Sequence, residues 1–201
     1  MKLPEIFLRL SSLYAEHGHR LFIIGGTSRD LLLGIDPSDI DLVTDATPEE
    51  EKAFLPDLEM TFARFGSVHL KTEAGDIDIT TLRRESGYKD SRHPSKIEFI
   101  RDLKEDSLRR DFTINALYID CQGNVSDYHG GLEDLKNRLI RFIGDPATRI
   151  QEDPLRILRA ERFAKRLGFQ IEENTQKAME EHRDLLCLLN PEKIAMEMKK
   201  E

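Results

Sequence analysis

Residues 21–30 read LFIIGGTSRD, and residues 39–43 read DIDLV. The apolar run that stops at the two glycines is typical of a buried strand, and residues 28–33 predict a short helix that follows it. The alternation of polar and apolar residues in 39–43 predicts a second strand with one apolar face. A strand, a glycine turn, a helix and an acidic strand in this order would place a phosphate site beside a metal site.

The glycine turn has the features of an anion site. Gly25 and Gly26 allow backbone amides to approach an anion closely, and a helix N-terminus adds positive potential. Arg29 would add a fork of hydrogen-bond donors. A pair of glycines is, on its own, more often an ordinary turn, so this signal needs support from the rest of the chain.

Asp39 and Asp41 supply that support. Alternate residues of a strand share one face, so both carboxylates can converge on one hard cation, such as Mg²⁺. A second pair, Asp76 and Asp78, lies on another expected strand, and one of the two could complete the metal site. The alternative for either pair is an exposed, solvated strand face.

The remaining segments predict an α+β fold. We expect a helix through residues 4–14, strands at 67–72, 76–82 and 97–100, a mobile loop at 84–95, a helix at 112–117 and a hairpin over 118–128. From about residue 145 the pattern predicts helices only. The prediction is therefore a mixed sheet flanked by helices in a head of residues 1–144, followed by an all-helical neck of residues 145–201.

Composition narrows the class of protein. The chain has 201 residues and a net charge of −8, and 34% of its residues are charged, as in a globular protein. It has neither an apolar run of about 20 residues nor a signal peptide, which argues against a membrane or secreted protein. Two distant cysteines, Cys121 and Cys187, favour a reduced, cytoplasmic setting. Acidic residues dominate the first 82 positions and arginines cluster in 83–166, which would suit carboxylates that hold metal and arginines that hold phosphate; composition alone favours solvated surface charge over this interpretation.

Several motifs together resemble one family. They are GGTSRDLLLG (25–34), DIDLVTDATPEE (39–50), ITTLRRESGYKDSRHP (79–94), RRDFTINAL (109–117), GGLEDLKNRLIRFIGDP (130–146) and EDPLRILRAERFAKRLGF (152–169). Their content and order resemble the catalytic head of the tRNA CCA-adding enzymes and bacterial poly(A) polymerases. These are template-independent nucleotidyltransferases related to DNA polymerase β. The resemblance covers residues 21–169.

The resemblance implies a role for each matched residue. Asp39 and Asp41 would bind metal, and Asp78 falls where the family has an acidic residue, usually glutamate, before a Thr-Thr-x-Arg stretch. The residues of the triphosphate-binding turn would be Gly25, Gly26, Ser28 and Arg29. Those of the ribose motif would be Arg110, Asp111 and Asn115. The side chains that read the base would be Asp153 and Arg156, which lie three residues apart and so on one helix face, with Arg159 extending a basic stripe.

The implied activity is addition of CMP and AMP to the 3′ end of tRNA, from CTP and ATP, with Mg²⁺ and release of pyrophosphate. A full-length loop at 85–94 and the absence of a Gly-Arg-Arg-Phe run at 63–67 favour CCA addition over CC addition or a poly(A) polymerase. The sequence also leaves open an A-adding enzyme and, from a different class, a catalytically silent nucleotide- or RNA-binding module. Family members continue into further helical domains, so we expect body and tail domains to be missing after residue 201. Nothing in the sequence indicates the oligomeric state.

Overall fold

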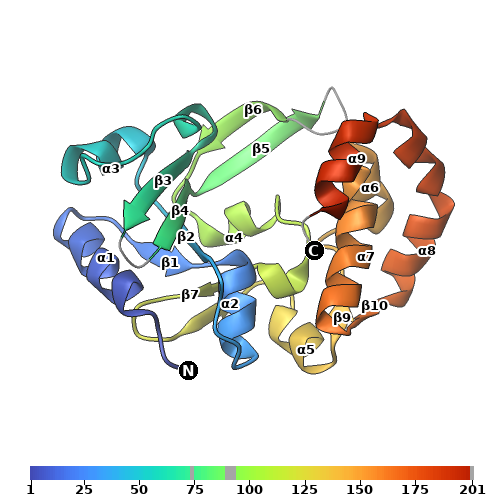
Figure 1. The fold of residues 1–201 in the computed structure, drawn as a ribbon, viewed down its shortest axis with the longest axis horizontal. Helices are drawn as coiled ribbons and strands as arrows, with labels where there is room; N and C mark the ends of the chain where they lie inside the picture. The colour runs from blue at the N-terminus through green and yellow to red at the C-terminus, as the bar shows by residue number, and fades with distance from the viewer. Residues whose placement is uncertain (73–74, 89–93, 200–201) are drawn as a thin grey trace. The chain divides into compact units, whose positions relative to one another are not determined.

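A computed structural model describes residues 1–72, 75–88 and 94–199 of the chain (Figure 1). The chain forms two compact units, each continuous in space but not in sequence. Unit 1 comprises Met1–Glu85, Ile97–Arg109 and Asn115–Tyr128, and unit 2 comprises Ser86–Lys96, Arg110–Ile114 and His129–Glu201. The functional division into a head of residues 1–144 and a neck of residues 145–201 stays a prediction.

Unit 1 contains a six-stranded mixed sheet, as the sequence predicts. Its strand order is β3-β4-β2-β1-β7-β8. Strands β2 and β4 are parallel, whereas β1–β2, β1–β7, β3–β4 and β7–β8 are antiparallel. The bounds are β1 (Leu21–Ile23), β2 (Ile40–Thr44), β3 (Ser67–Thr72), β4 (Gly75–Thr81), β7 (Leu117–Ile119) and β8 (Val125–Asp127).

Helices flank this sheet. They are α1 (Glu5–Glu16), α2 (Gly25–Leu32), α3 (Pro48–Phe54) and α4 (Leu103–Ser107), with a 3₁₀ turn, η1 (Ala63–Phe65). The start of α3 follows from its sequence: Thr47 and Glu50 form a reciprocal capping box, and Pro48 occupies the first turn. Helix α2 begins three residues earlier than expected, because the two glycines form its first turn.

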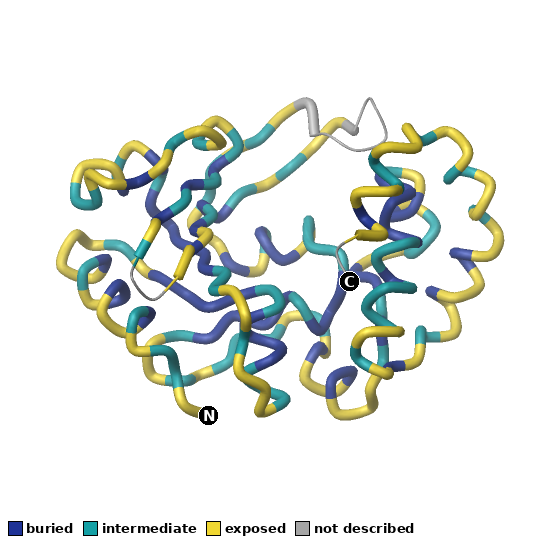
Figure 2. The backbone as a smooth tube through the Cα atoms, viewed as in Figure 1, coloured by how far each residue is buried: buried dark blue, intermediate teal, exposed yellow. Residues whose placement is uncertain are grey.

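The register gives the sheet two different faces. On one face Ile40, Ile77 and Leu70 are register neighbours on the adjacent strands β2, β4 and β3. This face packs with α1 into a buried core. On the other face Asp41, Asp78 and His69 lie abreast. Further along the same face, Val43 is buried in a second apolar cluster with Phe22, Ile24, Leu82, Leu103 and Tyr118. Figure 2 shows the resulting buried strands beneath exposed connections.

Unit 2 consists mainly of helices. They are α5 (Gly131–Lys136), α6 (Pro146–Glu152), α7 (Leu155–Leu167), α8 (Glu173–Glu181) and α9 (Pro191–Met198), with a 3₁₀ helix, η3 (Arg183–Leu188). Its core includes Phe112, whose ring stacks on Phe142 and meets the edge of Phe163, with centroids 5.2 and 5.4 Å away. Across the described residues, no helix combines the length and apolar character needed to cross a membrane.

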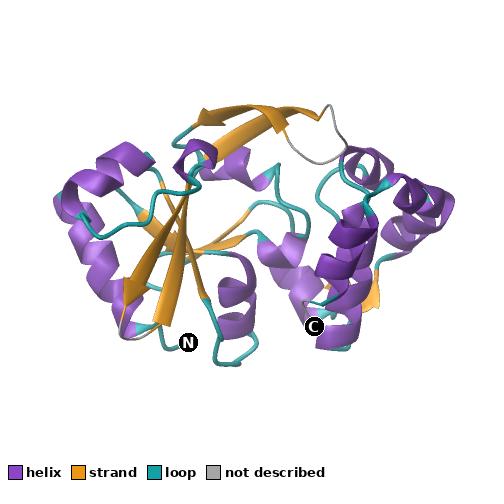
Figure 3. Cartoon of the chain, turned by 45° about the horizontal axis from the view of Figure 1, so that its top comes forward, coloured by secondary structure: helices purple, strands orange, loops and turns teal. Residues whose placement is uncertain are grey.

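Three segments differ from the predictions (Figure 3). The described part of 84–95 belongs to a two-stranded ribbon, β5 (Arg83–Tyr88) and β6 (Pro94–Phe99), while residues 89–93 lie outside the described residues. A ribbon outside the main sheet needs no alternating apolar face, so its strands lack that signal. Residues 112–117 form only a short 3₁₀ turn, η2 (Thr113–Asn115), before β7. Short strands β9 (Leu139–Ile140) and β10 (Gln170–Ile171) pair in parallel, and β10 interrupts the helices expected after residue 145.

Candidate active site

The glycine turn lies directly against the first acidic strand. Gly25 has a φ of +69°, in the left-handed region that favours glycine. A Cβ atom on Gly25 would lie 2.9 Å from Oδ2 of Asp41, a distance at which the carboxylate would have to move. The absence of a side chain at residue 25 therefore makes room for the Asp41 carboxylate, which ties the turn to the strand as the motif order predicts.

Thr27 fixes the start of β2, where both aspartates lie. Its hydroxyl donates to the carbonyl of Asp39 at 2.9 Å and accepts from the amide of Asp41 at 2.8 Å. Asp39 is exposed and Asp41 is half-buried. The sequence predicted both aspartates within one strand, but β2 begins at Ile40, so Asp41 lies in β2 and Asp39 lies in the bend just before it. The hydroxyl of Thr27, in the first turn of α2, holds the backbone of both residues. Sequence reasoning missed Thr27, because a threonine inside a glycine turn carries no signal of its own.

Asp78 is the direct neighbour of Asp41 in the parallel pair β2–β4. Its Oδ1 accepts a hydrogen bond from Nδ1 of His69 at 2.7 Å, and Nε2 of His69 lies 3.4 Å from Asp76. The hydrogen bond to Asp78 raises the pKa of His69. The described residues contain no group of three or more His, Cys, Asp or Glu side chains arranged to hold a metal ion. The structure thus places Asp78 beside the Asp39–Asp41 pair but engages it with His69.

Ser28 and Arg29 are both buried and have hydrogen-bond partners within the fold. Ser28 is fully buried and donates to the carbonyl of Gly25 at 3.1 Å. Arg29 is 1% exposed; its Nε donates to Asp30 at 2.8 Å and its Nη1 donates to Asn115 at 2.9 Å. Its Nη2 atom would lie 3.4 Å from a Cβ atom on Gly26, so the guanidinium lies next to the glycine turn. Its role as a donor for a phosphate stays a prediction.

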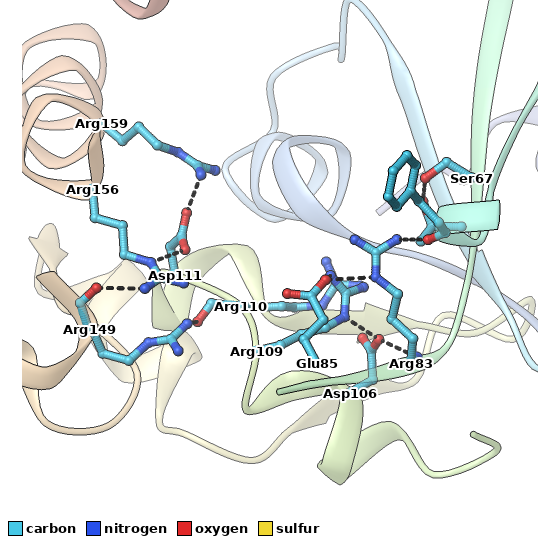
Figure 4. Close-up of polar contacts among 12 residues, drawn as sticks. Ser67, Arg83, Glu85, Asp106, Arg109, Arg110, Asp111, Arg149, Arg156 and Arg159 are labelled. Carbon is cyan, nitrogen blue, oxygen red and sulfur yellow. Dashed lines mark hydrogen bonds and ion pairs between the residues drawn. The ribbon is translucent and has the colours of Figure 1, made fainter. Parts of the chain in front are cut away.

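Unit 2 contains a second cluster of predicted residues, centred on Asp111 (Figure 4). Oδ1 of Asp111 accepts from Nε of Arg156 at 2.7 Å, and Oδ2 lies 2.6 Å from Nη1 of Arg159. Burial acts to raise the pKa of Asp111, but Arg159, Arg156 and Arg149 outweigh it and hold that pKa below its usual value. Asp111 is therefore ionised at neutral pH and orients two arginines.

Arg156 is held by several partners besides Asp111. Its Nη1 donates to the carbonyl of Arg149 at 2.6 Å and to Glu152 at 3.0 Å. The spacing placed Asp153 and Arg156 on one helix face, but Asp153 lies between α6 and α7 and accepts from the amide of Leu155 at 3.1 Å. Asp153 lies just before the first turn of α7, where that amide needs an acceptor. Burial raises the pKa of Asp153, against the opposing charge of Arg156.

One donor and one acceptor of this pair remain available. Among the described residues, no hydrogen bond uses Nη2 of Arg156 or Oδ2 of Asp153. Arg110 lies beside the cluster, and its carbonyl accepts from Nη2 of Arg149 at 3.1 Å (Figure 4). The structure thus brings Arg110, Asp111, Asp153, Arg156 and Arg159 together in unit 2. It brings Gly25, Gly26, Ser28, Arg29, Asp39, Asp41, Asp78 and Asn115 together in unit 1.

A buried polar network in unit 1 was not predicted from the sequence (Figure 4). Asp106 is fully buried and accepts from the amide of Arg83 at 3.0 Å, from Nε of Arg109 at 2.8 Å and from the hydroxyl of Tyr118 at 2.7 Å. Glu85 lies 2.7 Å from Nε of Arg83 and 3.6 Å from Nη1 of Arg109. The network fixes the start of β5 and the end of the segment before Arg110. Its only sequence signal is the spacing of Asp106 and Arg109 on one helix face.

Residues 21–141 match the family model described as poly A polymerase head domain. The chain belongs to this family. It is 42% identical to the CCA-adding enzyme of Bacillus licheniformis over 201 residues, which is 98% of this chain and 51% of that protein. It is 43% identical to the CCA-adding enzyme of Lactococcus lactis subsp. cremoris, over 99% of this chain and 51% of that protein. The chain thus spans about half the length of these curated relatives.

Solved structures agree with this assignment. The crystal structure of the Bacillus stearothermophilus CCA-adding enzyme in complex with CTP superimposes with a TM-score of 0.89 at 34% identity, over 100% of this chain and 49% of that one. A tRNA nucleotidyltransferase complexed with a primer tRNA and an incoming ATP analog gives a TM-score of 0.77 at 36% identity, over 94% of this chain and 55% of that one. The resemblance inferred from the motifs is confirmed.

Proposed function

We propose that this protein adds CMP and AMP to the 3′ end of tRNA, using CTP and ATP and releasing pyrophosphate. The observation that carries the proposal is the contact between the glycine turn and the acidic strand, where Gly25 leaves room for the carboxylate of Asp41. A phosphate-binding turn and a cation-binding carboxylate are adjacent there, as transfer of a nucleotide from its triphosphate requires. The relatives named CCA-adding enzymes support the choice of substrates.

Asp39 and Asp41 suit a divalent cation, which we propose is Mg²⁺. Asp41 lies at the start of β2 and Asp39 two residues before it, and Thr27 holds the backbone of both. Mg²⁺ typically binds one or two protein carboxylates and takes water and substrate phosphates as its remaining ligands. A pair of aspartates is therefore sufficient to hold it. When bound, it would stabilise the negative charge that develops on the reacting phosphate.

The other residues would position the nucleotide. The amides of the first turn of α2 would receive the triphosphate, next to Arg29, which donates to Asn115. In unit 2, Asp111 is ionised and can accept from a ribose hydroxyl while it orients Arg156. Nη2 of Arg156 and Oδ2 of Asp153 would meet the base, one as a donor and the other as an acceptor. Cytosine and adenine both present an acceptor ring nitrogen next to an exocyclic amine.

The place of action we propose is the cytoplasm, where tRNA is matured. Cys121 and Cys187 are free thiols in the structure, which is compatible with a reducing compartment.

The test is an extension assay on tRNA that lacks its terminal CCA. The RNA is incubated with CTP alone, with ATP alone and with both, and the products are separated by length. If the protein adds CCA, we expect two added nucleotides with CTP alone and three with CTP and ATP together. ATP without CTP should give no complete CCA end. Long homopolymeric tails from ATP would instead identify a poly(A) polymerase. Extension by ATP alone, only on an RNA already ending in CC, would identify an A-adding enzyme.

A further inference from the structure

Arg149 is a buried cation to which the proposed function gives no role. It lies in the last turn of α6, and its side chain is only 9% exposed. A guanidinium that leaves water needs partners in the protein, because burial of an unpaired charge is costly. Arg149 has such partners on two separate segments of unit 2 (Figure 4).

The side chain of Arg149 connects the segment of Arg110 and Asp111 to the end of α6. Its Nη2 donates to the carbonyl of Arg110 at 3.1 Å, and its Nη1 donates to Oε2 of Glu152 at 2.5 Å. The stem of the side chain runs along Gly144, where a Cβ atom would lie 3.8 Å from Cδ of Arg149. One planar group therefore holds two segments that are distant in the sequence.

The backbone of Arg149 contacts the two residues that are proposed to read the base. Its carbonyl accepts from Nη1 of Arg156 at 2.6 Å and from the amide of Asp153 at 3.3 Å. A displacement of Arg149 would therefore be transmitted to both base-reading residues at once.

Glu152 links Arg149 to Arg156 through a shared oxygen. Oε2 of Glu152 lies 2.5 Å from Nη1 of Arg149 and 3.0 Å from Nη1 of Arg156. Without Arg149, this carboxylate would be left to Arg156 alone, and a carboxylate binds a guanidinium most strongly through two parallel hydrogen bonds. Such a fork would engage Nη2 of Arg156, which is the nitrogen that is proposed to meet the base.

We propose that Arg149 is a positioning residue for base selection: it keeps Glu152 occupied and so leaves Nη2 of Arg156 available. The inference rests on the proposed function for the roles of Arg156 and Asp153, and it adds a residue that acts only through them. Loss of Arg149 should therefore change the preference between nucleotides, beyond any loss of stability.

The experiment compares the binding of CTP and UTP, separately from transfer. Isothermal titration calorimetry with Mg²⁺ and without RNA gives the dissociation constant of each nucleotide. We expect Arg149→Met to lower the ratio of the Kd for UTP to the Kd for CTP roughly tenfold, the scale of one lost hydrogen bond. Arg149→Gln also lacks the charge and should give the same loss, so it replaces Arg149→Met if that variant does not fold.

Two further variants separate positioning from structural support. Arg149→Lys keeps a cation beside Glu152 and should retain most of the preference for CTP. Glu152→Gln, combined with Arg149→Met, removes the carboxylate that would engage Arg156, so it should restore the preference. The matched control is Arg162→Met, which removes another buried guanidinium of unit 2, held by Glu197 at 2.8 Å. It should lower stability and leave the ratio unchanged.

An unchanged ratio in the variants that lack the charge would overturn the inference, even if both nucleotides bind more weakly. A loss that Glu152→Gln does not restore would also overturn it, and so would equal binding of CTP and UTP by the wild type. If the ratio falls as expected but the wild-type chain extends no tRNA, the role of Arg149 stands and the proposed function fails. If the wild type completes the CCA end but the ratio is unchanged in the variants, the proposed function stands and the inference fails.

Discussion

Gly25 combines a positive φ with a lack of space, because a Cβ atom there would lie 2.9 Å from Oδ2 of Asp41. We expect Gly25→Ala to destabilise the fold by about 1–2 kcal/mol, the usual cost of left-handed backbone for a residue with a side chain. It should also displace the carboxylate of Asp41, and a shift of about 1 Å can lower a rate by roughly a hundredfold. Unfolding in urea and CMP incorporation measure the two effects.

Gly34 provides the matched control for this prediction. It has a φ of +74°, and a Cβ atom there would meet nothing within 4 Å. Gly34→Ala should therefore lose similar stability and keep its activity. Equal activity of the two variants would show that the contact between residue 25 and Asp41 has no part in catalysis.

Arg156 allows a test of base selection at the scale of one side chain. Arg156→Lys keeps the positive charge next to Asp111 but removes the planar guanidinium, including the unused Nη2 donor. We expect the preference for CTP over UTP to fall roughly tenfold, which corresponds to about 1.4 kcal/mol for a hydrogen bond lost to the base. Steady-state kinetics with all four nucleotides would measure it. If full CTP preference were retained, Arg156 would only hold Asp111 and the carbonyl of Arg149.

A buried pair of hydrogen-bonded side chains links helix α1 to helix α3. The hydroxyl of Tyr14 donates to Oε1 of Glu51, and both residues are fully buried. Burial raises the pKa of Glu51 to about 8, although the hydrogen bond from Tyr14 acts in the opposite direction. A carboxyl group with a raised pKa in the folded state favours folding while it is protonated. The stability of this protein should therefore fall as the pH rises from about 4.5 to about 8.

Glu51→Gln tests this contribution, because glutamine resembles the protonated acid at every pH. We expect the free energy of unfolding of the wild type to decrease relative to that of the variant, by on the order of 1.4 kcal/mol per pH unit inside this window. Tyr14→Phe removes a contact that lowers the pKa of Glu51, so it should extend the window upward. Parallel pH profiles of the wild type and Glu51→Gln would contradict the assignment of a raised pKa to Glu51.

The elements that could be predicted are those with a strong local signal. The run before Gly25 and the alternation after Asp39 identify β1 and β2, and their spacing identifies the turn between them. The strand predicted at 97–100 overlaps β6, but β5 and its pairing with β6 could not be predicted, because the ribbon lies outside the main sheet and β5 lacks an alternating apolar face. Hydrogen-bond partners of side chains were also hard to predict, because they depend on residues that are distant in the sequence. The spacing placed Asp153 and Arg156 on one helix face, but Asp153 accepts from the amide of Leu155 before α7, and Arg156 donates to Asp111, which is distant in sequence.

The whole molecule carries a net charge of −8. Phosphate contacts dominate the affinity of proteins for nucleic acids, and an acidic surface opposes them. Several arginines are also engaged within the fold, such as Arg162 with Glu197 and Arg183 with Glu161. We therefore expect this 201-residue chain to bind tRNA weakly and with a steep dependence on salt, while it still binds CTP. Filter binding at several salt concentrations measures this, and tight binding that persists at high salt would contradict it.

The central claim is that Asp39 and Asp41 hold the cation needed for nucleotide transfer. The most direct test is CMP incorporation into tRNA lacking CCA by Asp39→Ala, Asp41→Ala and, as a control, Asp36→Ala, which removes a nearby exposed carboxylate outside β2. Circular dichroism checks that each variant is folded, as expected for strand-end residues with few apolar contacts. We expect no detectable incorporation by the first two variants and normal incorporation by the third. Undiminished incorporation by a folded Asp39→Ala or Asp41→Ala variant would contradict it.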